Sequence, residues 1–587
     1  MNLMNFLSQT DAIASKYSAE QLSAFIHDIG RVLPEQNRDD FLKRLKAAGA
    51  MTDQGSIKDI QSDQGFNEKY KLVRSNLKKF DSHKLAINAI LNEEYDEWYS
   101  DSGEEYYYKD NNGITDMLAE ACDFVHTCMD IGKYIEGLKI GNQLFTMEIL
   151  CTSEYEEFDF YLKDLVHYRL LDRNLMQVCL NTAYCAYHAV PLKKRPETLY
   201  EVLVNGKIDE ITLEKIMQHG DKELPDFQEF LTNWLSYLGT KTERNADRLI
   251  SEGIGLLDDL SAAAGYAEKY VAQHPGLYLN ILENGKNTDA NDMISIGIAA
   301  MKIIPKKYVM RSRTALKTAD YIMEADKNLS LLQKCYFVAY ESDTSALNYL
   351  RALLNGYEKK RDKLQEIFIK LPVQSSHSYG MYEAGSTYSE RKENRPDDNM
   401  ILILRFLDGQ FADVLADGLN KSEPLGWSGT FMKQGIALYL LYLYEGDWSG
   451  KGISAMADIV KKAMNFSAEA YQKGTYRQHE INENDLFCEV FTKWRSMTEM
   501  EPDIRISAVD KIAGLLVRRT EGIMNANRRN YYGECAAYIA ALGEVQESMG
   551  DTGAKQRLMT AYKDTYPRRS AFHEELGNYG WKNAKKL

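Results

Sequence analysis

The sequence predicts an all-α fold, an α-solenoid of degenerate tetratricopeptide-like helical hairpins, and three observations predict it. Proline is scarce, with 11 prolines among 587 residues, and long helices tolerate few internal prolines because proline lacks a backbone donor and clashes with the preceding turn. Apolar residues recur at helical spacing along most of the chain, whereas the alternation typical of strands is nearly absent. Short breaks such as HPGLY and EGDWSGKG separate the helical segments, which is the rhythm of stacked helical hairpins.

These breaks also predict the order of the parts. The first helical pattern, AEQLSAFIHDIGRVL, brings Leu22, Phe25, Ile29 and Leu33 near one face. The polar stretch MTDQGSIKDIQSDQG indicates a linker. Along the chain we expect an N-terminal helical segment (1–50), that linker (51–65), a helical domain with an acidic, tyrosine-rich stretch (66–240), helical repeats (241–372), a long loop rich in Ser, Gly and Tyr (373–398), and further helical repeats with a C-terminal cap (399–587).

The clearest repeat lies at residues 291–353. An alanine-rich helix, a proline turn and an arginine-bearing helix lead into CYFVAYESDTSALNYLRAL. Together with the closing stretch 531–580, this pattern resembles the helical repeat region of bacterial SWIM zinc-finger proteins and related uncharacterised families, over about residues 240–585. The ligand pairs of that finger, C-x-C and C-x-H, do not occur in this sequence. The resemblance therefore implies an α-solenoid fold and carries no zinc or nucleic-acid function with it.

The end of the chain, YPRRSAFHEELGNYGW, is expected to cap the solenoid. Pro567 should set a turn before a last helix, in which Phe572 and Leu576 lie four residues apart and share one face. The remaining charges, Arg568, Arg569, Glu574 and Glu575, would form the solvated outer face that a terminal repeat needs. An anion-binding site is the alternative interpretation of the same residues.

Composition excludes several classes of protein. The net charge is −15, which argues against a general phosphate-binding surface. The longest apolar run, Ile436 to Tyr444, is too short to cross a bilayer. The N-terminus lacks a basic start followed by an apolar run, so no secretory signal is expected. Eight scattered cysteines indicate reduced thiols and a cytoplasmic location. No P-loop and no G-x-S-x-G motif occurs, so a catalytic role is disfavoured.

Two cysteine–histidine pairs are candidates for a metal site. Cys122 and His126 lie four residues apart, and Cys185 and His188 lie three apart. On two antiparallel helices each pair would share a face, so the four could bind zinc in a tetrahedron. The alternative, which the absence of any standard finger spacing favours, is that the cysteines are small apolar core residues.

An acidic, aromatic stretch at residues 93–110 is a candidate partner surface. It contains eight acids, five tyrosines and one tryptophan. Tyr and Trp are enriched as anchors in protein interfaces, whereas a plain charge run is usually a solvated face. We expect steering of a basic partner by the acids and anchoring by the aromatic rings; the residues concerned are Glu93, Glu94, Asp96, Glu97, Trp98 and Tyr107.

A basic cluster within RRTEGIMNANRR is the second candidate partner surface. Arg518, Arg519, Arg528 and Arg529 could line one concave strip that suits an acidic protein segment or nucleic acid. The negative net charge favours a protein partner, or the chain's own acids, over nucleic acid.

The expected function is that of a non-catalytic protein–protein interaction scaffold or sensor within a larger bacterial assembly, of the kind used in defence or stress responses. Stacked helical pairs expose long surfaces and rarely build a preorganised catalytic pocket. Two alternatives stay open: a nucleic-acid-associated accessory protein that uses the arginine strip, and a zinc-binding protein or enzyme that uses the Cys/His pairs.

Overall fold

The computed structural model is mostly helical and divides into two compact units, Met1–Asp226 (unit 1) and Phe227–Leu587 (unit 2). The division precedes the predicted boundary at residue 240 by one helix. The structure describes residues 25–26, 63–80, 85–91, 106–154, 156–220, 222–285, 289–325, 328–371, 390–421, 423–474 and 482–582.

The predicted N-terminal segment and linker lie largely outside the described residues. Within 1–50 only Phe25 and Ile26 are described, and both are helical. The first long helix of the structure, α5 (Asp63–Lys78), begins inside the predicted linker 51–65.

Unit 1 contains a four-stranded sheet besides its helices, and the helical domain expected at 66–240 did not include this sheet. The strands are β1 (Ile87–Leu91), β2 (Tyr106–Lys109), β3 (Ile149–Thr152) and β4 (Glu157–Phe160), in the order β2-β1-β3-β4. Strands β1 and β3 run parallel, and the two outer pairs run antiparallel. The acidic, tyrosine-rich stretch therefore ends in an edge strand. Strands of four or five residues are too short for alternation to stand out from a helical pattern.

The helices of unit 1 pack on one another and on this sheet. They are α6 (Ile114–Asp130), α7 (Tyr134–Thr146), α8 (Leu162–His167), α9 (Leu175–Ala189), α10 (Arg195–Gly206) and α11 (Leu213–Met217), besides α5. Helix α9 packs against α6, α7 and α10. It approaches α7 closely because Gly141 leaves room for Thr182, whose Oγ1 would lie 2.2 Å from an added Cβ. The core of the unit includes Leu118, Phe124 and Ile140.

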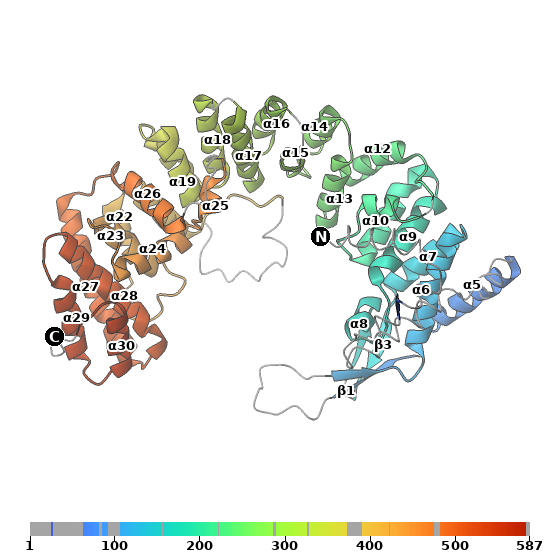
Figure 1. Cartoon of the computed structure of the whole chain (residues 1–587), viewed down its shortest axis with the longest axis horizontal. Helices are drawn as coiled ribbons and strands as arrows, with labels where there is room; N and C mark the ends of the chain where they lie inside the picture. Colours follow the sequence, from blue (N-terminus) through green and yellow to red (C-terminus); the bar gives the residue numbers. More distant parts are fainter. Residues whose placement is uncertain are drawn as a thin grey trace. The chain divides into compact units, whose positions relative to one another are not determined.

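Unit 2 is helical, and Figure 1 shows its helices following one another along the chain. In its first part the helices are α12 (Phe227–Leu238), α13 (Arg244–Gly255), α14 (Leu260–Lys269), α15 (Leu277–Asn284), α16 (Ala290–Ile303), α17 (Val309–Ala325), α18 (Leu329–Ser342), α19 (Ala346–Ala352), α20 (Arg361–Ile369), α21 (Asp398–Leu407) and α22 (Phe411–Gly418). From α12 to α22, the closely packed helix pairs are neighbours or next-but-one neighbours in the sequence.

The C-terminal part of unit 2 is arranged around α28. Its helices are α23 (Met432–Leu443), α24 (Lys451–Ala463), α25 (Ala468–Gln472), α26 (Glu483–Arg495), α27 (Pro502–Asn525), α28 (Tyr532–Ser548), α29 (Ala554–Thr565) and α30 (Ser570–Asn578). Helix α28 packs against α23, α24, α27, α29 and α30. The apolar run 436–444 forms the buried helix α23 and the residue after it. In the described part of the chain, no helix combines the length and the apolar character that a bilayer span requires.

The last helix, α30, packs on the C-terminal part of unit 2. Pro567 lies in the turn between α29 and α30, and Phe572 and Leu576 are fully buried. Arg569 donates hydrogen bonds to Asn527 Oδ1 (2.6 Å) and to the carbonyl of Met524 (2.7 Å). The two apolar side chains that were expected to share one face of this helix are thus both buried.

The predicted loop 373–398 leads into α21, which begins at Asp398. Residues 390–397, here called the anchoring segment, are held against unit 2 by backbone hydrogen bonds. The amide of Asn394 donates to the carbonyl of Lys307 (2.7 Å), and the amide of Val309 donates to the carbonyl of Lys392 (2.9 Å). The Asn394 side chain is buried and accepts from the amide of Thr344 (2.9 Å). The loop's first part lies outside the described residues.

Candidate ion-binding centre

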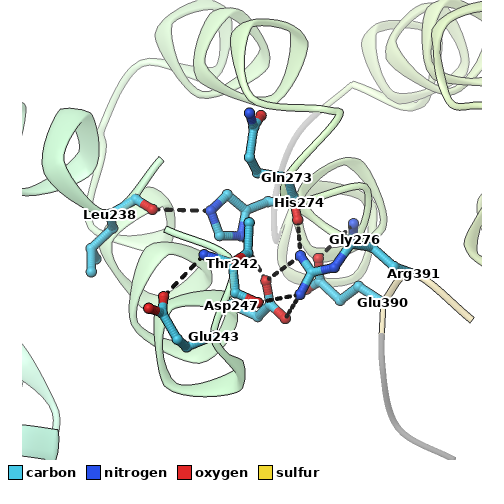
Figure 2. Close-up of polar contacts among 9 residues, drawn as sticks. All are labelled: Leu238, Thr242, Glu243, Asp247, Gln273, His274, Gly276, Glu390 and Arg391. Atoms are coloured by element: carbon cyan, nitrogen blue, oxygen red, sulfur yellow. Dashed lines mark hydrogen bonds and ion pairs between the residues drawn. The ribbon is translucent and has the colours of Figure 1, made fainter. Parts of the chain in front are cut away.

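Four charged or ionisable side chains from three parts of unit 2 meet next to helix α13. Asp247 lies in the first turn of α13, His274 lies between α14 and α15, and Glu390 and Arg391 begin the anchoring segment. Figure 2 shows the four side chains converging. Helix α13 and the His274 turn place two of them, and the anchoring segment supplies the other two from far along the chain.

The ring of His274 is held in one orientation within this cluster. This ring is fully buried. One ring nitrogen, Nδ1, lies 2.7 Å from Asp247 Oδ1, and the other, Nε2, lies 3.0 Å from the carbonyl oxygen of Leu238. A carbonyl oxygen only accepts, so Nε2 carries a proton and donates it to Leu238. This bond fixes the ring plane and aims Nδ1 at Asp247 (Figure 2).

Glu390 is half-buried beside these two residues. Its Oε2 accepts a hydrogen bond from the amide of Gly276 (2.9 Å), in the same turn as His274. Burial raises the pKa of the Glu390 carboxyl to about 7, and the negative charge of Asp247 adds to the shift. Two carboxylates in one poorly solvated place favour either a shared proton or a cation between them.

Arg391 is the cation that the structure places there. Its Nη1 lies 3.3 Å from Asp247 Oδ1 and its Nη2 lies 3.4 Å from Oδ2, a two-pronged pairing. The guanidinium also donates to the carbonyls of Gln273 and Thr242. Arg391 therefore ties the anchoring segment to both ends of the α13–α14 region.

The cluster has the donor set of a metal site. One ligand atom from each of Asp247, His274 and Glu390 can be chosen so that all three lie within 4.8 Å of one another. Among the residues that the structure describes, no other group of three or more Cys, His, Asp or Glu side chains comes this close together.

The predicted Cys/His site does not form such a group. On α6, Cys122 is buried and burial raises the pKa of its thiol to about 12. His126 lies one turn further along α6, with its side chain 52% exposed and its Nε2 3.5 Å from Asp130 Oδ2. Because one member of the pair is in the core and the other is in solvent, the i,i+4 spacing does not bring them to one ion.

The second predicted pair, on α9, is divided in a similar way. Cys185 is fully buried, and its Sγ fills the space over Gly137, where an added Cβ would lie 2.7 Å away. Burial raises the pKa of the Cys185 thiol to about 12. His188 instead stacks on Tyr134, with ring centroids 4.7 Å apart. The cysteines are packing residues between helices, in agreement with the alternative interpretation of the sequence.

One of the four arginines of the predicted strip, Arg519, is buried. Arg519 is 3% exposed and donates to Glu534 Oε1 (2.8 Å) and to the carbonyl of Pro424 (2.8 Å). Its guanidinium also lies 4.9 Å from the centre of the Trp427 ring. The other three members, Arg518, Arg528 and Arg529, are exposed. The helical turn of α27 turns Arg519 inward, next to an outward Arg518, so the four do not form one strip.

Most of the acidic partner surface lies outside the described residues: Glu93, Glu94, Asp96, Glu97 and Trp98. Its remaining member, Tyr107, lies on the edge strand β2 and is 46% exposed. The ammonium group of Lys109 lies 5.3 Å from the centre of the Tyr107 ring. Tyr108, the residue after Tyr107, faces the other side of the sheet and packs on Phe160.

A cavity of about 660 Å³ lies beside the end of α26 and is lined in part by Arg495, Arg505 and Glu445. Arg505 pairs with Glu445 at 2.5 Å, and Arg495 donates to the carbonyls of Tyr442 and Tyr444. These three charged side chains are therefore already engaged with the protein itself.

The sequence offered little that could have brought Asp247, His274 and Glu390 together. His274 belongs to the break HPGLY, and Glu390 belongs to the predicted loop. These residues are separated by 27 and 116 positions, and no motif links them. The chain matches no protein-family model and shows no significant similarity to a curated protein.

Proposed function

We propose that this chain is a non-catalytic protein-binding scaffold or sensor in a larger bacterial assembly, and that unit 2 is an α-solenoid of degenerate helical hairpins. One observation carries the proposal: from α12 to α22 the most extensive helix contacts join neighbours or next-but-one neighbours in the sequence, while residues 470–474, residues 494–498 and the anchoring segment add contacts from further along the chain. Local stacking of this kind builds extended surfaces, which such proteins use for binding. The resemblance to SWIM-protein repeat regions supports the same architecture and the bacterial setting.

The contacts between successive helices make such a surface stiff. Gly297 of α16 lies against Thr318 of α17, whose Oγ1 would lie 2.0 Å from an added Cβ, so the two helices approach closely. Arg311 of α17 is buried; it donates to the carbonyl of Met301 at 2.8 Å and to Glu341 of α18 at 2.7 Å. One side chain thus links three consecutive helices, which reduces the ordering cost of binding a partner.

Within unit 1, the edge strand β2 is the proposed contact for a basic partner. Tyr107 presents a half-exposed ring at the end of the acidic stretch 93–110. An exposed tyrosine supplies a large contact area at low cost in side-chain entropy, because only two torsion angles are ordered. The nearby acids would raise the association rate at low salt.

The test compares Tyr107→Ala with Tyr108→Ala, on the same strand but on opposite faces. A partner is first captured from the native host with the wild-type chain and then purified for kinetic measurements. Tyr107→Ala should speed dissociation of the partner and reduce the binding free energy by about 1–3 kcal/mol if Tyr107 is an anchor. The melting temperature should stay unchanged. Tyr108→Ala should lower the melting temperature, because its ring lies 4.9 Å from that of Phe160. Equal partner kinetics for wild type and Tyr107→Ala would remove this strand from the proposal.

A second variant tests the electrostatic contribution to association by neutralising four acids together: Glu93, Glu94, Asp96 and Glu97. The quadruple variant should slow association and flatten its salt dependence, with little effect on dissociation. A wild-type chain that captures no protein partner, yet converts a small molecule with a measurable turnover, would contradict the scaffold function itself.

A further inference from the structure

We propose that Asp247, His274 and Glu390 bind one Zn²⁺ ion, which fastens the anchoring segment to α13 and to the turn between α14 and α15. The three side chains offer one imidazole nitrogen and two carboxylate oxygens, with one ligand atom of each lying within 4.8 Å of the others. Zinc accepts this mixture in sites with three protein ligands and a water molecule. Mg²⁺ and Ca²⁺ prefer oxygen ligands alone, so the histidine selects against them.

The surroundings of His274 are those of a metal ligand. A metal-bound histidine typically donates its second ring N–H to a carbonyl or carboxylate, which fixes the ring orientation. Here Nε2 has the carbonyl of Leu238 at 3.0 Å, and Nδ1 faces the two carboxylates. The ring is fully buried, so its orientation is set by packing before any ion arrives.

The carboxylates have outer partners of the same kind. The amide of Gly276 holds Glu390 through Oε2. Arg391 contacts both oxygens of Asp247, at 3.3 and 3.4 Å. Once the proton between His274 and Asp247 has left, the two carboxylates and the positive Arg391 carry a net charge of −1, and Zn²⁺ brings the cluster to +1.

Side-chain movements of up to about 1.5 Å would admit the ion. Zinc–nitrogen and zinc–oxygen bonds of about 2.0–2.2 Å at a tetrahedral angle place two ligand atoms about 3.3 Å apart. The Nδ1 to Oδ1 separation is 2.7 Å, so Asp247 has to withdraw by about 0.6 Å, and the ligand atoms that lie up to 4.8 Å apart have to approach one another. The proton shared between these two atoms is displaced to solvent when the ion takes its place.

The ion would join residues that are distant in the sequence. Glu390 lies 114 positions from Gly276, and the anchoring segment makes its next contacts at Lys307 and Thr344. A ligand that binds only the assembled site stabilises the docked segment in proportion to its concentration over its dissociation constant. The segment contains Arg391 and Lys392, so trypsin can report whether it is docked.

The first experiment is a zinc titration of the full chain after chelator treatment. Calorimetry and metal analysis should find one Zn²⁺ that Glu390→Gln weakens by about tenfold or more. Glu393→Gln is the matched control, because Glu393 belongs to the same segment but pairs with Lys307 and Arg395 at the surface. Cys185→Ser tests the Cys/His pairs and should leave this zinc in place. Mg²⁺ and Ca²⁺ should not compete.

The second experiment measures tryptic cleavage after Arg391 and Lys392 by mass spectrometry. Zn²⁺ should slow cleavage there several-fold in wild type and Glu393→Gln, and a chelator should reverse the effect. Glu390→Gln should show no protection. Zinc binding with equal affinity in wild type and Glu390→Gln, or cleavage of the wild type that zinc does not change, would overturn the proposal. The wild-type chelator comparison needs no variant, so a poorly folded mutant cannot obscure the result.

Discussion

At the scale of single residues, two half-buried histidines of unit 1 make its stability depend on pH. His188 stacks between Tyr134 and Tyr184, and its Nε2 is buried without a hydrogen-bond partner. Burial lowers the pKa of His188, and the positive charges of Arg195 and Lys222 lower it further. Burial also lowers the pKa of His219, with a smaller lowering from His126 and an opposing effect of Asp130.

Both shifts have the same consequence. The unfolded chain takes up a proton near the ordinary histidine pKa of 6.5, whereas the folded unit resists protonation until the pH is lower. The contribution to stability is therefore present above pH 6.5 and is lost as the pH falls through the folded pKa. His188→Phe keeps an aromatic ring in the stack and removes the ionisable group. The free energy of unfolding, measured by urea at several pH values, should fall less steeply toward pH 5 in this variant.

His167→Phe is the matched control for that measurement. His167 is an exposed histidine at the end of α8, and its replacement should leave the wild-type pH dependence in place. If His188→Phe and wild type lose stability in parallel between pH 7.5 and pH 5, the His188 imidazole is not the source of the effect.

At the scale of elements, the crossing of α24 and α28 depends on a glycine. A Cβ at Gly452 would lie 2.3 Å from the amide nitrogen of Ala541, a backbone atom that cannot swing aside. Glu544 of α28 completes the contact by accepting the amides of Gly452 (3.1 Å) and Ile453 (2.8 Å), and Lys555 neutralises it at 2.6 Å. Gly452→Ala should lower the free energy of unfolding by about 1–3 kcal/mol, because overpacking forces the helices apart.

Gly514→Ala, within the long helix α27, should have the opposite effect. An added Cβ there meets nothing within 4 Å, and alanine is the better helix former by about 0.5–1 kcal/mol. Thermal or urea unfolding of the two variants separates close packing from helix propensity. Equal destabilisation by both would mean that the α24–α28 distance is not set by Gly452.

The same scale shows how far the sequence could lead. Low proline content and helical spacing predicted the dominance of helices, and the i,i+4 pair Phe572 and Leu576 predicted the buried face of the last helix. The strands were not predicted from the sequence, because a strand this short has only two inward residues, such as Ile149 and Cys151 in β3. The burial of Arg519 and the Asp247 cluster were not predicted for another reason. Local spacing indicates which residues share a helix face, but it does not indicate which face meets a distant segment.

At the scale of the whole molecule, each unit has a core of its own, so each should have its own unfolding transition. Leu118 of α6 is fully buried in the core of unit 1, and Leu441 of α23 is fully buried in the core of unit 2. Truncation of a buried leucine to alanine costs about 2–5 kcal/mol, since it leaves a cavity that the surroundings fill only in part.

Leu118→Ala should therefore lower the protection of unit 1 amides against hydrogen exchange, for example in peptides from α6 and α9, and leave those from α28 unchanged. Leu441→Ala should do the reverse. The pair is matched in chemistry and in burial, so a difference in which amides respond reports only which core was damaged. If either variant lowers protection in both units to the same extent, the two cores unfold as one cooperative structure. The chain would then act as a single body in binding.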